Sequence, residues 1–265
     1  MKHNILSYLS PEYPWKEQLY CKPITGSTND DLKQLARQGA PHGTAVLALA
    51  QTGGHGRMGR SFHSPEGMGI YLSILLRPAC GPTELMHLTC AAAEAMCDAV
   101  EAAAGFRPGI KWTNDLVFGK KKLGGILTEL GLSPRGGVDY AIVGIGINCR
   151  QQAEDFPPAL REMAGSLAMV TGKPVELAQV AAAMLEALQA MDAMLLPKKA
   201  DILAAYRRDC VTVGQEISVV QGDSLRRGKA LSVDENGALV VSFPDGTVEP
   251  VNSGEVSIRG MYGYV

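Results

Sequence analysis

The sequence predicts an α+β fold: a mixed sheet with helices, followed by a small β barrel. Apolar, strand-like segments alternate with helical ones over most of the chain. Near residue 211 the pattern changes to short alternating segments separated by turn signals such as Asn236-Gly237. The length of 265 residues suits one medium and one small domain. We expect an N-terminal extension, a main domain and a C-terminal five-stranded barrel, over residues 1–19, 20–210 and 211–265.

Composition excludes several classes of protein. Hydrophobic residues make up 46% and charged residues 20%, which is ordinary for a folded chain and argues against disorder. The net charge of −2 gives no overall electrostatic attraction to nucleic acid. No apolar run approaches the roughly 18–20 residues of a membrane helix, and the N-terminus lacks the apolar core of a secretion signal. The six cysteines show no C-x-x-C spacing, so we expect reduced, buried thiols in a cytoplasmic protein without a membrane partner.

The helices and strands of the main domain are predicted from its capping residues, its helix-ending glycines and its apolar runs. A strand-like LYCKPI leads to a helix that starts at Ser27-Thr28, with a downstream acid as the partner in a capping box, and ends near Gly39. A second helix is expected from Thr83 to Ala104, where Gly105 stops it, and a third helical region over 158–209. The expected strands lie at 44–50, 69–76, 115–118, 123–130 and 140–148.

The glycine-rich stretch 51–61 carries the first chemical signal. It satisfies both the dinucleotide pattern G-x-G-x-x-G and a P-loop pattern with Arg60 in place of lysine. Both patterns need a helix to follow, and the SFHSPEGMG that comes next cannot open one. The glycines still allow close backbone approach to a ligand, and Arg57 and Arg60 offer forked donors for a phosphate or carboxylate. A surface loop with two solvated arginines is the alternative.

The segment from Arg107 to Lys122 is the second signal. It contains five cations and one acid, a local charge of +4 in a weakly acidic chain. Asn114 and Asp115 offer oxygens to a hydroxyl group or to a magnesium ion. Lys122 opens a strand, so its side chain can point into a pocket. Taken alone, the Lys120–Lys122 run is also consistent with a charged hairpin turn.

Four motifs in register resemble one family. They are Q-x-x-G-x-G-R-x-G-R from Gln51, K-W-x-N-D from Lys111, K-L-x-G-I-L-x-E from Lys122 and G-x-G-I-N from Gly144. In this order and spacing they are similar to those of biotin protein ligases. The resemblance is strong over roughly residues 20–150, and the small C-terminal β domain also fits it.

The resemblance implies a fold and a reaction. The fold would be an α+β catalytic domain related to class II aminoacyl-tRNA synthetases, with an SH3-like C-terminal barrel. Biotin and ATP, with Mg²⁺, would react to biotinyl-5′-AMP and pyrophosphate. A lysine of a biotin carboxyl carrier protein, such as that of acetyl-CoA carboxylase, would then take the biotin and release AMP. The resemblance allows for a homodimer, because relatives differ in oligomeric state.

The resemblance to biotin protein ligases also implies roles for individual residues of this sequence. Lys122 and Arg57 match the residues that serve both the biotin carboxylate and the phosphate, and are the expected catalytic pair. The further biotin-binding positions are Ser27, Thr28, Gln51, Gly54, Gly56, Trp112, Gly125 and Leu127. The further ATP positions are Arg60, Asn114, Asp115, Gly144, Gly146 and Asn148, with Asp115 also the expected Mg²⁺ ligand. In the C-terminal domain, Glu255 and Arg259 match residues that pack toward the catalytic domain.

Three departures from the family pattern stand out. His55 replaces the usual arginine, which removes a permanent cation and makes the charge of the loop depend on pH near neutrality. Thr113 replaces the usual proline, which should loosen that turn. Where some relatives stack adenine on an aromatic residue from the helical region, Phe156 or an aliphatic residue would have to do so here.

Three other functions compete with biotin ligation. A DNA-binding regulator is not expected, because only about 19 residues precede the catalytic region. A lipoate- or octanoate-attaching enzyme shares the fold and the acceptor lysine, but not the pairing of the first two motifs. A non-catalytic biotin-binding module is the third, with His55 in its favour and the presence of Lys122, Arg57 and Asp115 against it.

Overall fold

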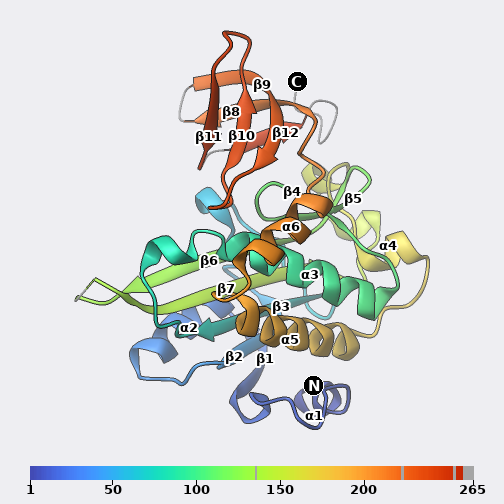
Figure 1. The fold of residues 1–265 in the computed structure, drawn as a ribbon. Helices are drawn as coiled ribbons and strands as arrows, with labels where there is room; N and C mark the ends of the chain where they lie inside the picture. Colours follow the sequence, from blue (N-terminus) through green and yellow to red (C-terminus); the bar gives the residue numbers. More distant parts are fainter. Residues whose placement is uncertain (135, 222–223, 253–254, 259–265) are drawn as a thin grey trace.

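The main domain is built on one mixed sheet. The computed structural model describes residues 1–134, 136–221, 224–252 and 255–258. A seven-stranded sheet has the order β1-β2-β3-β7-β6-β5-β4, in which β1 and β2 are parallel and the other neighbours antiparallel (Figure 1). Its strands are β1 (Leu19–Thr25), β2 (Ala45–Gln51), β3 (Gly69–Leu76), β4 (Gly109–Lys111), β5 (Asp115–Phe118), β6 (Lys121–Leu132) and β7 (Val138–Asn148).

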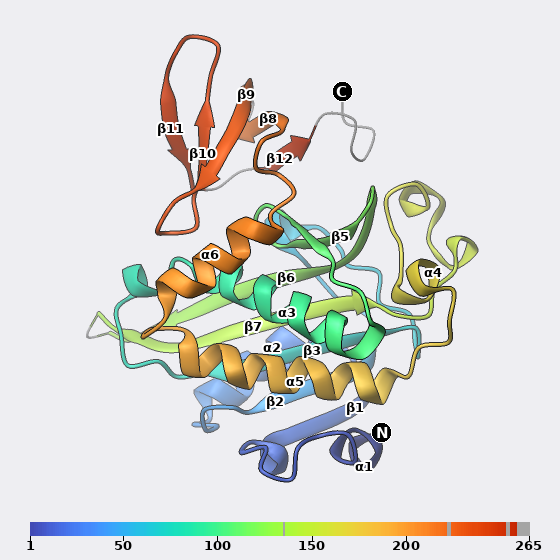
Figure 2. The same cartoon turned by 45° about the vertical axis from the view of Figure 1, so that its right-hand side comes forward.

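Helices cover both faces of this sheet. On one face, α3 (Leu88–Ala104) and α5 (Leu177–Met194) pack side by side, with α6 (Lys199–Asp209) beside α3 (Figure 2). On the other face, α2 (Thr28–Arg37) packs on β2, β3 and β7. Side chains alternate along each strand, so the two faces have separate apolar cores. The short helix α4 (Leu167–Thr171) lies after β7.

The first eighteen residues pack against the main domain. They contain the short helix α1 (Lys2–Leu6), which contacts α5. Ile5, Leu9 and Tyr13 are buried in the core that α3 and α5 share. This segment therefore contributes apolar surface to the main core.

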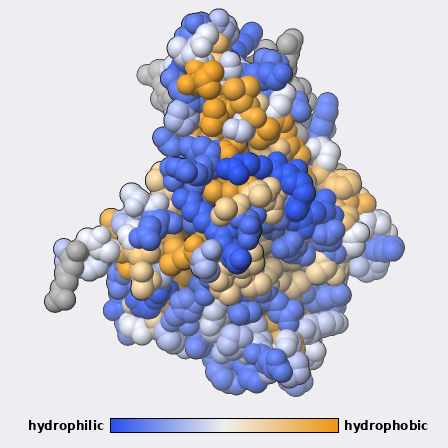
Figure 3. Space-filling model, viewed as in Figure 1, coloured by the Kyte–Doolittle hydropathy of each residue, from blue (hydrophilic) through white to orange (hydrophobic). Residues whose placement is uncertain are grey.

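The C-terminal domain is a five-stranded antiparallel sheet of order β11-β10-β9-β8-β12. It stands at one end of the main domain and shows an apolar patch above a hydrophilic belt (Figure 3). Its exposed apolar side chains include Leu225, Leu231 and Val248. The strands are β8 (Glu216–Gln221), β9 (Ser224–Val233), β10 (Leu239–Ser242), β11 (Val248–Val251) and β12 (Glu255–Ile258).

The predicted fold class is confirmed, with local differences. The second helix begins at Leu88 and not near Thr83, because Pro82–Leu85 forms a separate 3-10 turn. Residues 158–166 contain one short 3-10 turn rather than a helix. No helix among the described residues is long and apolar enough to cross a membrane. All six cysteines are free, four of them buried.

The helix that follows β1 begins differently from the prediction. Ser27 is its N-cap residue, but the Ser27 side chain makes no capping hydrogen bond. Asp31 accepts a hydrogen bond from the Thr25 hydroxyl at 2.7 Å and pairs with Lys22 at 2.9 Å. The acid therefore ties the helix to β1 and does not close a capping box.

Candidate active site

One cavity of about 590 Å³ collects nearly all the residues singled out from the sequence. It lies between the start of α2, the glycine-rich loop, the β4–β5 turn and the paired ends of β6 and β7. Gly54 is not among its lining residues and lies behind Gln51, whose Nε2 atom would be 2.8 Å from a Cβ at Gly54. The predicted residues that line the cavity are Ser27, Thr28, Gln51, His55, Gly56, Arg57, Arg60, Trp112, Asn114, Asp115, Lys122, Gly125, Leu127, Gly144, Gly146, Asn148 and Phe156.

One end of the cavity is formed by neutral polar groups, and we call it the hydroxyl end (Ser27, Thr28, Asn29 and Gln51). The first three are buried and Gln51 is half-buried. The Thr28 backbone N–H and hydroxyl both donate to Oε1 of Gln51, at 2.9 and 3.1 Å. Nε2 of Gln51 donates in turn to the Ser64 hydroxyl at 3.2 Å. These bonds fix the orientation of the Gln51 amide before any ligand binds.

The sequence reasoning missed Asn29, which links this end to the sheet. Its Oδ1 atom accepts from the Ser73 hydroxyl at 2.6 Å, and its Nδ2 atom donates to Glu129 at 2.8 Å. Glu129 also pairs with Lys33 at 2.8 Å. The available signal was Ser73 itself, a polar residue in the middle of the apolar strand GIYLSILL, because a buried hydroxyl requires a partner.

Two glycines of β7 make room for side chains of the cavity wall. A Cβ at Gly144 would lie 2.0 Å from Oδ1 of Asn29, and a Cβ at Gly146 would lie 2.4 Å from the Phe62 ring. No real Cβ atom makes such short contacts. The G-x-G part of the G-x-G-I-N motif is therefore needed for Asn29 and Phe62 to lie across the strand.

The other end of the cavity carries charge, and we call it the cationic end (Arg57, Asn114, Asp115 and Lys122). Nζ of Lys122 lies 2.6 Å from Oδ1 of Asp115, and the two side chains are 35% and 19% exposed. Nη1 of Arg57 donates to Oδ1 of Asn114 at 3.2 Å, and Nδ2 of Asn114 donates to the Ile126 carbonyl. The two cations thus face the cavity beside amide and carboxylate oxygens.

The glycine-rich loop folds back on itself at the mouth of the cavity. Gly56 N–H donates to the Arg60 carbonyl at 2.7 Å, and Phe62 N–H to the Gly54 carbonyl at 2.8 Å. Met58, at the tip, has a φ of 58° and is 70% exposed. Nδ1 of His55 lies 3.1 Å from the Gly53 carbonyl. The loop therefore holds its backbone groups and Arg57 at the edge of the cavity.

The segment that follows β7 closes the side of the cavity next to Lys122. Lys122 N–H donates to the Met163 carbonyl at 2.7 Å, and Gly165 N–H donates to the Lys122 carbonyl at 2.8 Å. Asn148 donates through Nδ2 to the Gly165 carbonyl at 3.0 Å. Phe156 is buried at this wall. Asn148 thus holds the segment in place as well as lining the cavity.

Two predicted contacts fall on parts of the chain that are not described. Arg259 lies outside the described residues, and so does the side chain of Glu255, whose backbone belongs to β12. Their expected packing toward the main domain stays a prediction.

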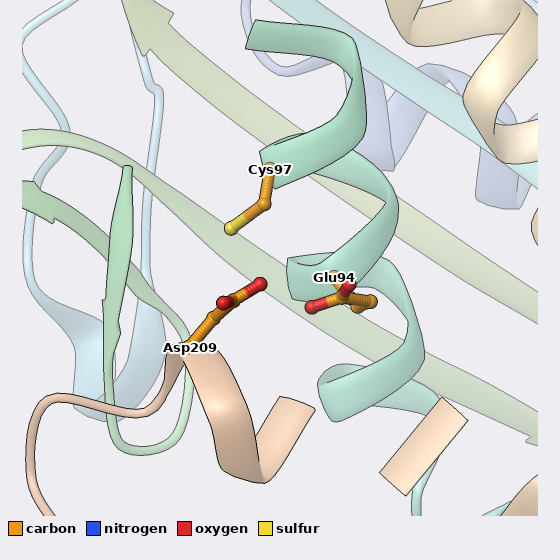
Figure 4. Close-up of side chains that lie close together, drawn as sticks. All are labelled: Glu94, Cys97 and Asp209. Atoms are coloured by element: carbon orange, nitrogen blue, oxygen red, sulfur yellow. The ribbon is translucent and has the colours of Figure 1, made fainter. Parts of the chain in front are cut away.

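Outside the cavity, Glu94 and Cys97 of α3 and Asp209 at the end of α6 form a second group of chemically capable side chains (Figure 4). Arg107 pairs with Glu94 at 2.5 Å and with Asp209 at 2.7 Å, and Arg208 pairs with both acids. Burial raises the pKa of Glu94 to about 7. Arg107 and Arg208 both bind Oε1 of Glu94 and also pair with Asp209, so these ion pairs link α3 to α6.

Comparison with known proteins agrees with the geometry of the cavity. Two family models match, the Biotin/lipoate A/B protein ligase family over residues 22–148 and the Biotin protein ligase C terminal domain over residues 212–259. The bifunctional ligase/repressor BirA of Bacillus spizizenii is 33% identical over 243 residues, which cover 91% of this chain and 74% of that protein. The chain belongs to the biotin protein ligase family.

Other members of the biotin protein ligase family are similar over almost their full length. The biotin–[acetyl-CoA-carboxylase] ligase of Mycobacterium tuberculosis is 30% identical, over 91% of this chain and 89% of that one. The structure of the Aquifex aeolicus biotin protein ligase in complex with biotin and ATP superposes with a TM-score of 0.76 at 29% identity, covering 91% of this chain and 98% of that one. As a member of the biotin protein ligase family, the chain is a ligase.

Proposed function

We propose that this ligase activates biotin with ATP and transfers it to a lysine of a biotin carboxyl carrier domain. The observation that carries the proposal is the single cavity that joins the hydroxyl end to the cationic end. Neutral donors and acceptors at one end suit the ureido group of biotin. Lys122 and Arg57 at the other end suit the carboxylate and the phosphates, which repel each other and need fixed positive charge between them.

In the first step the biotin carboxylate oxygen attacks the α-phosphorus of ATP. A new O–P bond forms, the bond from the α-phosphorus to the bridging oxygen breaks, and pyrophosphate leaves. In this proposal Lys122, whose Nζ lies 2.6 Å from Oδ1 of Asp115, neutralises both the carboxylate and the α-phosphate. Arg57, which donates to Asn114, keeps the phosphate of the adenylate. Alignment of two bound anions supplies much of the rate enhancement.

In the second step the neutral ε-amine of the carrier lysine attacks the carbonyl carbon of the mixed anhydride. The C–N bond forms, the C–O bond to AMP breaks, and the amine gives up a proton to solvent. The glycine-rich loop at the mouth of the cavity limits access of water, which would otherwise hydrolyse the adenylate. No nucleophilic serine or cysteine is needed.

The residues at the cationic end also fit Mg²⁺ that arrives on ATP. Mg²⁺ prefers oxygen ligands and is commonly bound through one or two carboxylates together with substrate phosphates. Asp115 offers one such carboxylate in the cavity, and Asn114 an amide oxygen. When bound, the ion would offset negative charge on the phosphates.

The proposal is tested by isotope exchange between ATP and pyrophosphate, with biotin, lipoate or octanoate as the acid. Exchange with biotin alone, followed by transfer to a purified carrier domain, is the expected result. Exchange with lipoate or octanoate in its place would assign the enzyme to those acids. Binding of biotin with no exchange for any acid would indicate a binding module.

A further inference from the structure

The turn between β4 and β5 is held by groups that lie outside the cavity. The indole Nε1 of Trp112 donates to the Gly237 carbonyl of the C-terminal domain at 2.9 Å, and both residues are buried. The backbone N–H of Trp112 donates to the Thr212 hydroxyl at 2.9 Å. The Tyr206 hydroxyl donates to the Thr113 carbonyl at 3.1 Å. The wall that Trp112 forms is thus fixed by Gly237 and Thr212 of the small domain and by Tyr206 of α6.

The turn that receives Trp112 is rigid in its own right. It spans residues 234–238, between β9 and β10. Oδ1 of Asp234 accepts from the backbone N–H groups of Asn236 and Ala238, at 2.8 and 2.9 Å. Nζ of Lys199, on α6, donates to Oδ1 of Asn236 at 3.3 Å. The Gly237 carbonyl is therefore presented to the indole by a turn that is anchored at both sides.

Only glycine fits at the point of contact. Gly237 has a φ of +85°, and a Cβ there would lie 2.9 Å from Sγ of the buried Cys90. Any side chain would strain the backbone and push the turn away from α3. The carbonyl that accepts from Trp112 would move with it.

The other end of the Lys111–Asp115 segment is in the cavity. Asn114 holds Arg57, and Asp115 holds Lys122. We propose that the 234–238 turn is a positioning element of the active site, which fixes Trp112 and thereby the segment that presents Asn114 and Asp115 to ATP. The role assigned to ATP rests on the proposed function, whereas the contact with Trp112 does not.

The same domain contains a matched control turn at 243–247. Gly246 has a φ of +86° with nothing within 4 Å of a Cβ, and it is exposed. Asp245 accepts from Thr247 just as Asp234 accepts within its own turn. In both views the turn between β9 and β10 faces the main domain and the turn between β10 and β11 points away from it (Figures 1 and 2). The two turns differ mainly in what they face.

The first arm of the test is spectroscopic. The chain has two tryptophans, so Trp15→Phe leaves Trp112 as the sole indole, and an aromatic ring remains beside Gly43. In this background we expect Gly237→Ala to shift the emission of Trp112 to longer wavelength and to increase its quenching by acrylamide. Gly246→Ala should leave both unchanged. If Gly237→Ala does not fold, Asp234→Ala against Asp245→Ala makes the same comparison without a steric clash.

The second arm is kinetic and uses ATP–pyrophosphate exchange. Gly237→Ala should raise the KM for ATP on the order of tenfold, within the range caused by displacing a positioned group, while kcat changes little. The KM for biotin should rise as well, because Trp112 is itself an expected biotin-binding residue and lines the cavity. Gly246→Ala should match the wild type.

Two results would overturn the inference. In one, Gly237→Ala keeps the Trp112 emission and the KM for ATP of the wild type. In the other, Gly237→Ala and Gly246→Ala change both quantities equally, which would show that the domain is merely destabilised. An enzyme that is inactive with biotin would refute the proposed function, yet the emission of Trp112 would still test the contact.

Discussion

The two ends of the cavity differ in charge and in exposure to solvent. At the hydroxyl end, Ser27, Thr28 and Asn29 are at most 6% exposed, and the Gln51 amide has partners on both sides. At the cationic end, Lys122 is 35% exposed and pairs with Asp115. One end is a preformed recognition site with little freedom. The other end holds a partly exposed cation, Lys122, that can bind a phosphate in place of Asp115.

The largest expected effect is at the cationic end. Lys122→Ala should slow adenylate formation by about 100- to 1,000-fold. It removes a fixed charge whose interaction with the substrates is stronger in the transition state than in the ground state. Exposed Lys120, two residues away, gives the matched control Lys120→Ala, which should keep full activity. Exchange rates and circular dichroism of both variants provide the measurement. Normal exchange by the folded Lys122 variant would refute the role of this lysine.

At the hydroxyl end the corresponding change is Gly144→Ala. The new Cβ would lie 2.0 Å from Oδ1 of Asn29 and would displace the start of α2. Biotin should bind about 10- to 100-fold more weakly, the equivalent of one or two lost buried hydrogen bonds. Titration calorimetry with biotin alone measures this. Gly137→Ala, in the same hairpin, meets nothing closer than 3.9 Å and should bind normally; equal affinities for both variants would contradict the preformed site.

Arg57→Gly separates making the adenylate from keeping it. Lys122 remains, so biotinyl-AMP should still form, but it should dissociate about 10- to 100-fold faster because a charge-assisted hydrogen bond to its phosphate is lost. Filter retention of radiolabelled adenylate gives the rate. Retention equal to that of the wild type would show that the loop does not hold the phosphate.

The cluster around Glu94 gives a smaller effect that should not reach the cavity. Its folded-state pKa of about 7 lies above the unfolded value of about 4.3, so the folded protein holds this proton more tightly. Stability from this group is therefore present at acid pH and is lost as pH rises through 7. Relative to Glu94→Gln, the wild type should lose stability between about pH 4 and pH 7 in urea titrations. A constant difference across that range would contradict the raised pKa.

The smallest effect concerns the loop. His55→Arg restores a permanent cation near the cationic end and should lower the KM for ATP by up to about fivefold, as expected for a partly exposed charge. Steady-state kinetics of both proteins provide the measurement. A KM for ATP equal to that of the wild type would show that a permanent charge at this position does not act on the nucleotide.

Much of this architecture could be predicted from the sequence, for identifiable reasons. The near-continuous apolar runs predicted β3 and β7, and Gly105 in the left-handed conformation ends α3 as expected. The predicted start of α3 was wrong because Thr83 lies in a separate 3-10 turn. The short strand β4, only three residues long, left no periodic signal.

The active site also has features that the sequence predicts and features that it does not. Motifs local in sequence identified the lining of the cavity, since four of them meet there. Contacts between distant residues could not be predicted. Asn29 accepts a hydrogen bond from Ser73, 44 residues away, and Trp112 donates one to Gly237, 125 residues away. No rule of sequence spacing links either pair. Such pairs become visible only once the sheet and the small domain are in place.

The most direct test of the account is whether biotinyl-5′-AMP forms in this cavity. The purified protein is mixed with biotin and Mg·ATP without a carrier, and the bound product is measured by mass spectrometry beside released pyrophosphate. We predict about one adenylate and one pyrophosphate per active site for the wild type, formed about 100- to 1,000-fold more slowly by Lys122→Ala. Binding of both substrates by the wild type without adenylate or pyrophosphate would contradict the account.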